Sequence, residues 1–143
     1  MVQYIYRMYL KYKHIALADD DCEDKEMLKE ALEKICPDIH LTLADDGATL
    51  LNILKTIPRP DFIILDINMP LIDGKECLKV LKNKQTMKAI PVMMYSTSSN
   101  NTDIQEAFSN GADYYVLKPN SMAEINKLAE DICTGTLKSS FKS

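Results

Sequence analysis

The sequence contains only four glycines in 143 residues, and no Gly-x-Gly-x-x-Gly pattern follows any of its apolar segments. A dinucleotide-binding domain of the common kind needs such glycines, so the sequence disfavours that class. It also lacks an apolar stretch long enough to cross a bilayer, and its N-terminus lacks the apolar segment of a signal peptide. We therefore expect no association with a membrane.

Closely spaced cysteines are also missing, and the chain has no excess of basic charge. The cysteines lie far apart, at Cys22, Cys36, Cys77 and Cys133, without a Cys-x-x-Cys motif. This spacing gives no support to a zinc or redox site, and we expect reduced structural cysteines in a cytoplasmic protein. The net charge of −4 argues against nucleic acid as a direct partner.

What the sequence does contain is an alternation of short apolar segments with stretches whose apolar residues recur at helical spacing. The apolar segments are nearly continuous, as in parallel strands that are covered on both faces. The repeated βα order predicts an α/β domain with three layers and a parallel sheet. The predicted strands span residues 14–18, 39–44, 62–65, 91–96 and 114–117.

The length is that of one ordinary domain, which we place at residues 14–133. Residues 134–143 are expected to form a frayed tail. Residues 1–13 are expected to be a poorly ordered extension. Their alternating apolar and aromatic residues leave an extra strand or an interaction arm as the alternative.

Charged and polar residues stand where the predicted strands end. Asp19 and Asp20 follow the first strand, Asp66 ends the third, Ser96 ends the fourth and Lys118 follows the fifth. Any one of these aspartates alone could be a turn residue or a helix cap. Together, however, carboxylates favour Mg2+, and a cation, an ammonium group and a hydroxyl suit phosphoryl transfer. The sequence therefore predicts a magnesium and phosphate site with Asp66 as the nucleophile.

These residues lie in an ordered set of motifs. The motifs are "ALADDD", "ILDINMP" followed by Asp73 and Gly74, the hydroxyl after "PVMMY", and "GADYYVLKP". Asp66 follows Asp20 by 46 residues, and Lys118 follows Asp66 by 52. The set resembles the receiver domains of bacterial two-component response regulators, in particular those that are similar to chemotaxis regulators. This resemblance implies a flavodoxin-like, doubly wound sheet with five parallel strands in the order 2-1-3-4-5.

The resemblance implies roles for the acidic residues. Asp66 would accept a phosphoryl group from a sensor histidine kinase or a histidine phosphotransfer protein. Asp20, Asp66 and the backbone oxygen of Asn68 would bind Mg2+, or Mn2+, directly, and Asp19 would act through a water molecule.

The resemblance also implies a switch. Lys118 would pair with the phosphoryl oxygens and be followed by a cis peptide bond to Pro119. Ser96 would swing toward the phosphoryl group, and Tyr115 would turn inward. The face made by the fourth helix, fifth strand and fifth helix would carry the signal to an unknown downstream protein. We expect a stand-alone receiver, a monomer or weak homodimer, that catalyses only its own phosphorylation and dephosphorylation and is otherwise no enzyme.

An enzymatic alternative is a haloacid-dehalogenase-like phosphatase, which also uses an aspartate at a strand end. That family has a second aspartate two residues after the nucleophile, where this chain has Asn68. A calcium-binding EF-hand that opens at Asp19 is disfavoured, because Asp24 stands where the calcium loop needs glycine.

Overall fold

The computed structural model describes residues 10–142 as a regular alternation of strands and helices. Each strand begins and ends within one residue of the segment that the sequence predicts. Four-residue and five-residue strands are short, and continuous apolar runs of that length are typical of strands inside a covered parallel sheet. The strands are β1 (His14–Ala18), β2 (His40–Ala44), β3 (Phe62–Asp66), β4 (Val92–Ser96) and β5 (Tyr114–Leu117).

The strands form one parallel sheet in the order β2-β1-β3-β4-β5, which confirms the predicted flavodoxin-like fold. The register pairs Ala18 with Leu65 and Asp66 with Tyr95. Because the pairing is parallel, the carboxyl ends of β1, β3 and β4 lie side by side. The strand order reverses between β1 and β3, and ligands of open α/β sheets bind outside the strand ends at such a point.

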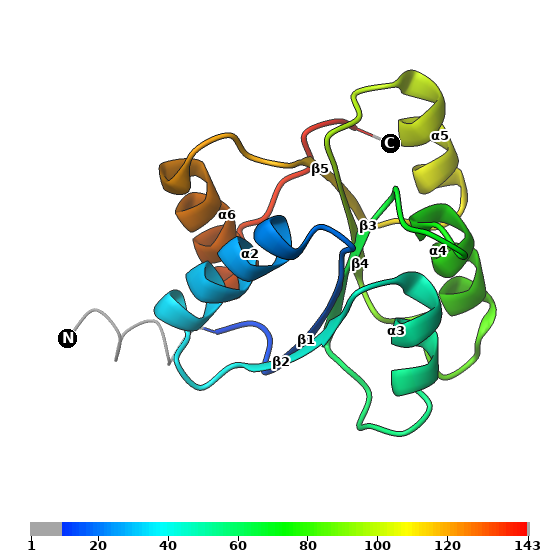
Figure 1. Ribbon diagram of the computed structural model, residues 1–143, viewed down its shortest axis with the longest axis horizontal. Helices are drawn as coiled ribbons and strands as arrows, with labels where there is room; N and C mark the ends of the chain where they lie inside the picture. The colour runs from blue at the N-terminus through cyan, green and yellow to red at the C-terminus, as the bar shows by residue number, and fades with distance from the viewer. Residues whose placement is uncertain (1–9, 143) are drawn as a thin grey trace.

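The connecting helices are α2 (Cys22–Ile35), α3 (Gly47–Ile53), α4 (Gly74–Asn83), α5 (Asn101–Ser109) and α6 (Met122–Thr134). Helices α2 and α6 cover one face of the sheet, and α3, α4 and α5 cover the other (Figure 1). This gives the three layers that the sequence predicts. Among residues 10–142, no helix has both the length and the apolar character that a membrane span requires.

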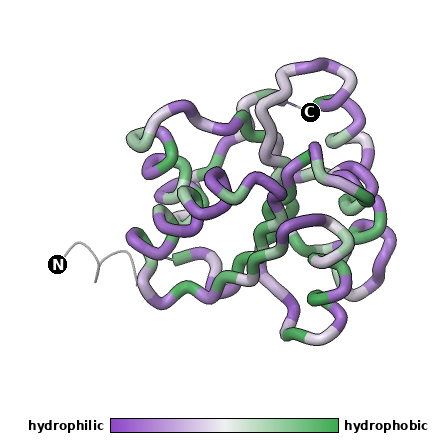
Figure 2. The backbone as a smooth tube through the Cα atoms, in the orientation of Figure 1, coloured by the Kyte–Doolittle hydropathy of each residue, from purple (hydrophilic) through white to green (hydrophobic). Residues whose placement is uncertain are grey.

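The two faces of the sheet bury separate apolar layers. Every residue of β1, β3 and β4 is buried. Successive side chains of β3 point to opposite faces, so Ile63 and Leu65 join the core under α3 to α5 while Phe62 and Ile64 join the core under α2 and α6. The trace coloured by hydropathy shows apolar residues concentrated along these central strands (Figure 2). The strand ends are therefore held by packing on both sides.

Short polar side chains begin the helices. Asp21, Asp46 and Asp73 each accept a hydrogen bond from the backbone N–H three residues on, and Ser121 does the same at α6. An N-cap of this kind stabilises a protein by about 1 kcal/mol. Some acidic residues near the carboxyl end of the sheet are thus helix caps, which leaves Asp19, Asp20 and Asp66 as the ones to examine for chemistry.

The N-terminal extension is described only from residue 10. Tyr12 is buried, and its ring stacks on that of Phe62 with the ring centroids 4.7 Å apart. The backbone N–H of Lys11 donates to the carbonyl oxygen of Cys133 at 2.8 Å. The end of the extension therefore packs on the domain, whereas the extra strand or arm that its first residues could form lies outside the described residues.

The C-terminal end differs from the frayed tail that the sequence predicts. Residues 135–142 leave α6 and run beside β5, as the red end of the chain shows (Figure 1). There the N–H of Ser140 donates to the carbonyl oxygen of Tyr115 at 2.8 Å. The physical reason for the difference is that β5 is an edge strand, whose open backbone groups pair with the tail.

Candidate functional site

Asp66 is the last residue of β3 and is only 5% exposed. The chain turns back directly after it, so that the N–H of Gly74 donates to the carbonyl oxygen of Ile67 at 2.8 Å. A Cβ atom on Gly74 would lie 2.8 Å from the Cα atom of Ile67 and closer still to the carbonyl oxygen of Asp66. Glycine at this position thus allows the tight turn that holds the backbone of Asp66.

The loop after β1 brings two further carboxylates to Asp66. Asp19 is fully buried, whereas Asp20 is exposed. One carboxylate oxygen from each of the three residues lies within 4.8 Å of those of the other two. The backbone N–H of Asp21 donates to Asp19 Oδ1 at 2.9 Å, which fixes the orientation of that carboxylate. The structure therefore brings together the acidic residues that the sequence singles out.

Lys118 lies opposite these carboxylates and carries the positive charge. Its Nζ atom is 2.9 Å from Asp19 Oδ2 and 3.7 Å from Asp66 Oδ2. The N–H of Lys118 donates to the carbonyl oxygen of Ser96 at 2.8 Å, which ties the end of β5 to the end of β4. The peptide bond before Pro119 is not cis, contrary to the expectation from the resemblance, and Lys118 reaches the carboxylates without it.

Asp66 and Lys118 lie so close together that the charge of each shifts the pKa of the other. Burial raises the pKa of Asp66 most, the Asp19 carboxylate raises it further and the Lys118 ammonium opposes them, which leaves a pKa of about 7. Burial alone would lower the pKa of Lys118, but the neighbouring carboxylates outweigh burial and raise that pKa. The ammonium therefore stays charged at neutral pH, while the charge on Asp66 depends on what else occupies the pocket.

Ser96 and Tyr115 lie next to each other on the side of the pocket toward α5. Ser96 is fully buried, and its Oγ atom accepts a hydrogen bond from the N–H of Ser98 at 3.0 Å. The ring of Tyr115 is also buried, and its hydroxyl donates to the carbonyl oxygen of Ser98 at 2.8 Å. Tyr115 thus already points inward. The reorientation of Ser96 and Tyr115 on phosphorylation stays a prediction.

Two residues beside Lys118 were not predicted from the sequence. Asp24, in the first turn of α2, places Oδ2 at 2.9 Å from Lys118 Nζ. The ring centroid of Tyr95 is 5.5 Å from the same atom, within the range of a cation–π contact. A carboxylate in the first helical turn after "DDD" is a signal that could have suggested Asp24, whereas nothing in the sequence singles out Tyr95.

A second lysine, Lys25, contacts the backbone of the site. It lies in α2 and is buried although it is charged, and its Nζ atom donates to the carbonyl oxygen of Asp19 at 3.1 Å. The same ammonium group forms an ion pair with Asp45 in the loop after β2. Lys25 therefore connects two of the loops at the carboxyl end of the sheet and holds the backbone of the acidic pair.

The donor set fits a hard divalent cation. Asp19 Oδ2 is buried and, apart from its ion pair with Lys118, has no hydrogen-bond partner among residues 10–142. Carboxylate oxygens of this kind are the ligands that Mg2+ and Mn2+ prefer. Asn68 lies on the exposed loop after β3, and the role of its backbone oxygen as a ligand stays a prediction.

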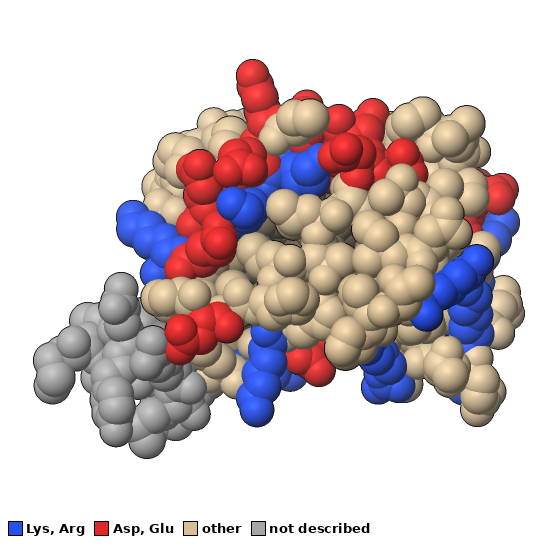
Figure 3. Space-filling view, turned by 60° about the horizontal axis from the view of Figure 1, so that its bottom comes forward, with Lys and Arg blue, Asp and Glu red and all other residues tan. Residues whose placement is uncertain are grey.

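Charge is unevenly spread over the surface. Asp and Glu side chains gather around a few basic ones along one rim of the molecule, whereas other basic side chains lie toward the opposite rim (Figure 3). A concentration of negative charge raises the local concentration of cations. The surface therefore favours the approach of a divalent cation to an acidic pocket.

The fold and the pocket together define a class of protein: a doubly wound α/β domain in which clustered carboxylates at the strand ends face a buried ammonium group. Residues 15–130 match the response regulator receiver domain family. The chain belongs to this family.

Relatives and solved structures agree with this assignment. The chain is 29% identical to the response regulator Rcp1 of Synechocystis sp. over 126 residues, which cover 84% of this chain and 86% of Rcp1. The structure of the Mn2+-bound form of Rcp1 superposes with a TM-score of 0.77 at 29% identity and covers 84% of this chain and 91% of that one. That of the phosphorylated cyanobacterial phytochrome response regulator RcpA gives 0.81 at 27% identity, covering 91% and 99%.

Membership of the family sets the general function. Receiver domains are phosphorylation-controlled signalling domains that act with histidine kinases or phosphotransfer partners, and they are not generally classed as enzymes. None of these relatives supports the alternative of a haloacid-dehalogenase-like phosphatase.

Proposed function

We propose that Asp66 is the phosphoacceptor of a signalling switch. An oxygen of its carboxylate attacks the phosphorus of a phosphohistidine on a sensor histidine kinase or a phosphotransfer protein. The P–O bond to Asp66 forms, the P–N bond breaks, and the imidazole leaves with its electron pair. The observation that carries this proposal is the position of Asp66 at a strand end, within reach of both an acidic pair and the Lys118 ammonium.

The acidic residues would hold the cation that this reaction needs. Asp20, Asp66 and the backbone oxygen of Asn68 would bind Mg2+, or Mn2+, directly, and Asp19 would act through a water molecule. A bound divalent cation neutralises charge on phosphoryl oxygens. Asp19 is buried and oriented by the N–H of Asp21, so its carboxylate would face the cation site in a fixed direction.

The remaining residues would stabilise the phosphoryl group on Asp66 and change their positions in response to it. Lys118 would pair with a phosphoryl oxygen, because its ammonium already lies 3.7 Å from Asp66 Oδ2. Ser96 would turn its hydroxyl toward another oxygen. Tyr115 would change its position with Ser96. The face formed by α5, β5 and α6 would then signal to a downstream protein. These elements are the fourth helix, fifth strand and fifth helix of the predicted units.

The proposal extends to the organisation of the chain. Residues 14–133 would form the receiver, between an extension over residues 1–13 and a tail over residues 134–143. It would act as a monomer or weak homodimer and catalyse only its own phosphorylation and dephosphorylation. The four free cysteines, three of them buried, suit a reducing cytoplasm.

Incubation with acetyl phosphate and Mg2+ tests the acceptor. We expect intact-mass spectrometry to show one added phosphoryl group, which is absent in Asp66→Asn and after chelation of the metal. Asp73→Asn is the matched control, because Asp73 lies in the same loop and asparagine also caps helices well. Persistent labelling of Asp66→Asn, or loss of labelling in Asp73→Asn alone, would contradict the proposal.

A further inference from the structure

The chain beyond α6 is docked beside β5, on the face to which the proposed function assigns signalling. Gly135 ends α6 in the left-handed conformation with φ 77°, and the chain then turns back toward β5. The hydroxyl of Thr136 donates to Asp131 Oδ1 at 2.7 Å, and its N–H donates to the carbonyl oxygen of Asp131 at 3.0 Å. We call residues 135–142 the docked tail. Its path is therefore set where it leaves the helix.

The docked tail satisfies the open edge of β5. The N–H of Tyr115 donates to the hydroxyl of Ser139, and the N–H of Leu117 donates to the hydroxyl of Ser140, both at 3.0 Å. In return, the N–H of Ser140 donates to the carbonyl oxygen of Tyr115 at 2.8 Å. An edge strand with free donors and acceptors is a general docking place for an extended segment. Here the chain's own tail takes that place.

Apolar contacts fix the docked tail on both sides of β5. Phe141 meets the ring of Tyr115 edge to face, with the ring centroids 5.9 Å apart, and packs against the core under α3 to α5. Leu137 packs against the opposite core, under α2 and α6. An extended segment that combines paired backbone groups with two anchored side chains is typical of peptide recognition at a sheet edge.

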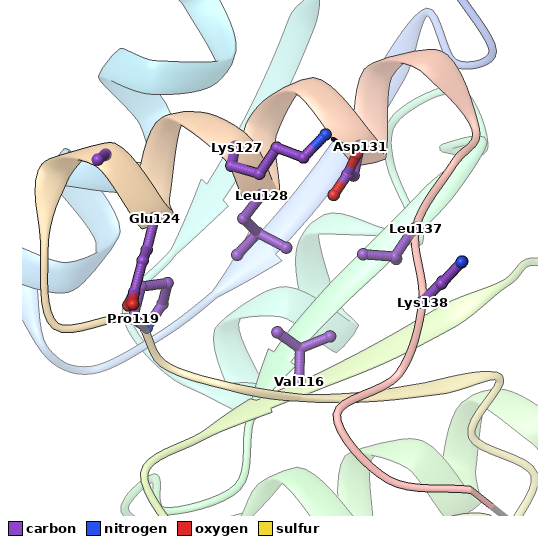
Figure 4. A pocket seen from close by; sticks show the side chains of 9 residues that line it. Val116, Pro119, Glu124, Lys127, Leu128, Asp131, Leu137 and Lys138 are labelled. Atoms are coloured by element: carbon purple, nitrogen blue, oxygen red, sulfur yellow. Dashed lines mark ion pairs between the residues drawn. The ribbon is translucent and has the colours of Figure 1, made fainter.

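The docking leaves a groove of about 360 Å³ between α6, β5 and the docked tail. Its apolar part is formed by Val116, Leu128 and Leu137, and charged side chains from α6 and the tail stand around it (Figure 4). An ion pair of 3.2 Å between Lys127 and Asp131 lies along its α6 side (Figure 4). The tail is thus one wall of a surface depression and does not fill a closed core.

Tyr115 connects the docked tail to the phosphorylation site. Its ring and backbone contact the tail, while its hydroxyl donates to the carbonyl oxygen of Ser98. The N–H of Ser98 donates in turn to the hydroxyl oxygen of Ser96. If Ser96 turns toward a phosphoryl group on Asp66, Ser98 loses this acceptor and the hydroxyl of Tyr115 is disturbed.

We propose that the edge of β5 is a docking surface for an extended segment, that the docked tail is its resident occupant, and that phosphorylation of Asp66 releases the tail. This inference rests on the proposed function, because it takes Asp66 as the acceptor. The released edge fits a partner segment that supplies backbone groups for β5, hydroxyl side chains for the N–H groups of Tyr115 and Leu117, and an aromatic ring for the place of Phe141. The tail itself becomes available at the same time.

Hydrogen exchange on the full chain tests this inference. Exchange is followed with acetyl phosphate and Mg2+ in excess, so that hydrolysis does not empty the acceptor, and with Asp66→Asn in the same mixture as the control. Release predicts that the amides of Tyr115, Leu117 and Ser140 exchange about tenfold faster or more after phosphorylation, while amides of β3 keep their rates. Intact mass of the same sample gives the phosphorylated fraction.

The outcomes separate this inference from the proposed function. Failure of the protein to gain a phosphoryl group overturns the proposed function and this inference with it. A phosphorylated sample with unchanged exchange at the three amides overturns the inference alone. Faster exchange that appears only together with a dimer would show that dimerisation displaces the tail, and it would overturn release by phosphorylation itself.

Two variants test the docking itself without phosphorylation. Phe141→Ala should speed exchange of the Tyr115 and Leu117 amides, because the tail loses its aromatic anchor. Lys142→Ala is the matched control, since Lys142 is the exposed next residue, and it should leave both rates unchanged. Equal rates in the wild-type protein and both variants would show that Phe141 does not hold the tail, against the proposal.

Discussion

The ammonium group of Lys118 lies closer to Asp24 than to Asp66, at 2.9 Å from Asp24 Oδ2 and 3.7 Å from Asp66 Oδ2. Lys118 is thus held between the carboxylates of three different segments, because Asp19 Oδ2 also lies at 2.9 Å. If Asp66 is the acceptor, as proposed, part of the charge on Lys118 is directed away from it before a phosphoryl group arrives. We therefore expect Asp24 to affect how readily Lys118 turns to a new anion.

A first prediction concerns this competition. Asp24→Asn removes one of the carboxylates that hold Lys118, so we expect acetyl phosphate to phosphorylate Asp66 about two- to fivefold faster, the effect of losing one partly exposed ion pair. Glu23→Gln, an exposed neighbour in the same helical turn, should leave the rate unchanged. The rate is measured by intact mass against time. A slower reaction in Asp24→Asn would mean that Asp24 positions Lys118 for the reaction and does not compete with it.

A second prediction concerns the stability of the pocket. Lys118→Gln leaves buried Asp19 and Asp66 without their counter-charge, and breaking a buried pair in this way costs about 3 to 5 kcal/mol. The free energy of unfolding in urea should fall by that order in the metal-free protein, and Mg2+ should restore part of it. The control is Lys127→Gln, at an exposed position of α6, with an expected change below about 1 kcal/mol. Equal losses in the two variants would contradict the buried ion pair.

A third prediction is a pH dependence of stability. The pKa of Asp66 rises from 3.8 to about 7 on folding in the absence of metal, mainly through burial. The folded state therefore holds this proton more tightly than the unfolded state. The resulting stabilisation is fully present below pH 3.8 and is lost as the pH rises through about 7.

Comparison with Asp66→Asn removes the titration of this carboxylate and leaves ionisable groups away from the pocket unchanged. In the presence of a chelator, the unfolding free energy of the variant should rise relative to that of the wild-type protein as the pH rises. The expected relative increase is about 1 to 3 kcal/mol at pH near 8. Added Mg2+ should reduce the difference. A difference in unfolding free energy that stays constant from acid to neutral pH would exclude a raised pKa for Asp66.

A fourth prediction concerns the turn that carries Asp66. A Cβ atom at position 74 meets backbone atoms of Asp66 and Ile67, which cannot move aside as a flexible side chain can. Gly74→Ala should therefore lower the unfolding free energy by about 2 to 4 kcal/mol and weaken Mg2+ binding. In Gly111→Ala the new atom meets the flexible side chain of Lys82, and the positive φ costs about 1 to 2 kcal/mol without an effect on Mg2+. Similar Mg2+ affinities in both variants would contradict this account.

The fold was predictable from the sequence because its signals are local. Continuous apolar runs such as Phe62 to Leu65 indicate covered parallel strands, and the structure places each strand within one residue of its predicted bounds. The residues at the strand ends could be singled out for the same reason. A parallel sheet brings Asp19, Asp66 and Lys118 together at the carboxyl ends of its strands, although they lie far apart in the sequence.

What could not be predicted depends on side-chain direction or on single contacts. Asp24 and Tyr95 reach Lys118 only because α2 and β4 present them to it. Asp24 lies outside the quoted motifs, and Tyr95 ends "PVMMY" without a role that the motif implies. The docked tail carries few apolar residues, and its sequence is typical of a frayed end. Its order comes from the free edge of β5 and from two apolar anchors, Leu137 and Phe141, so it follows mainly from the sheet and not from the tail's own composition.

The most direct test of the central claim is to locate the phosphoryl group chemically. Borohydride reduces an aspartyl phosphate to homoserine, which marks the acceptor in a peptide map. After incubation with acetyl phosphate and Mg2+, we predict homoserine at position 66 and no other converted aspartate. Homoserine at Asp19, Asp20 or Asp24 with Asp66 intact would contradict the account.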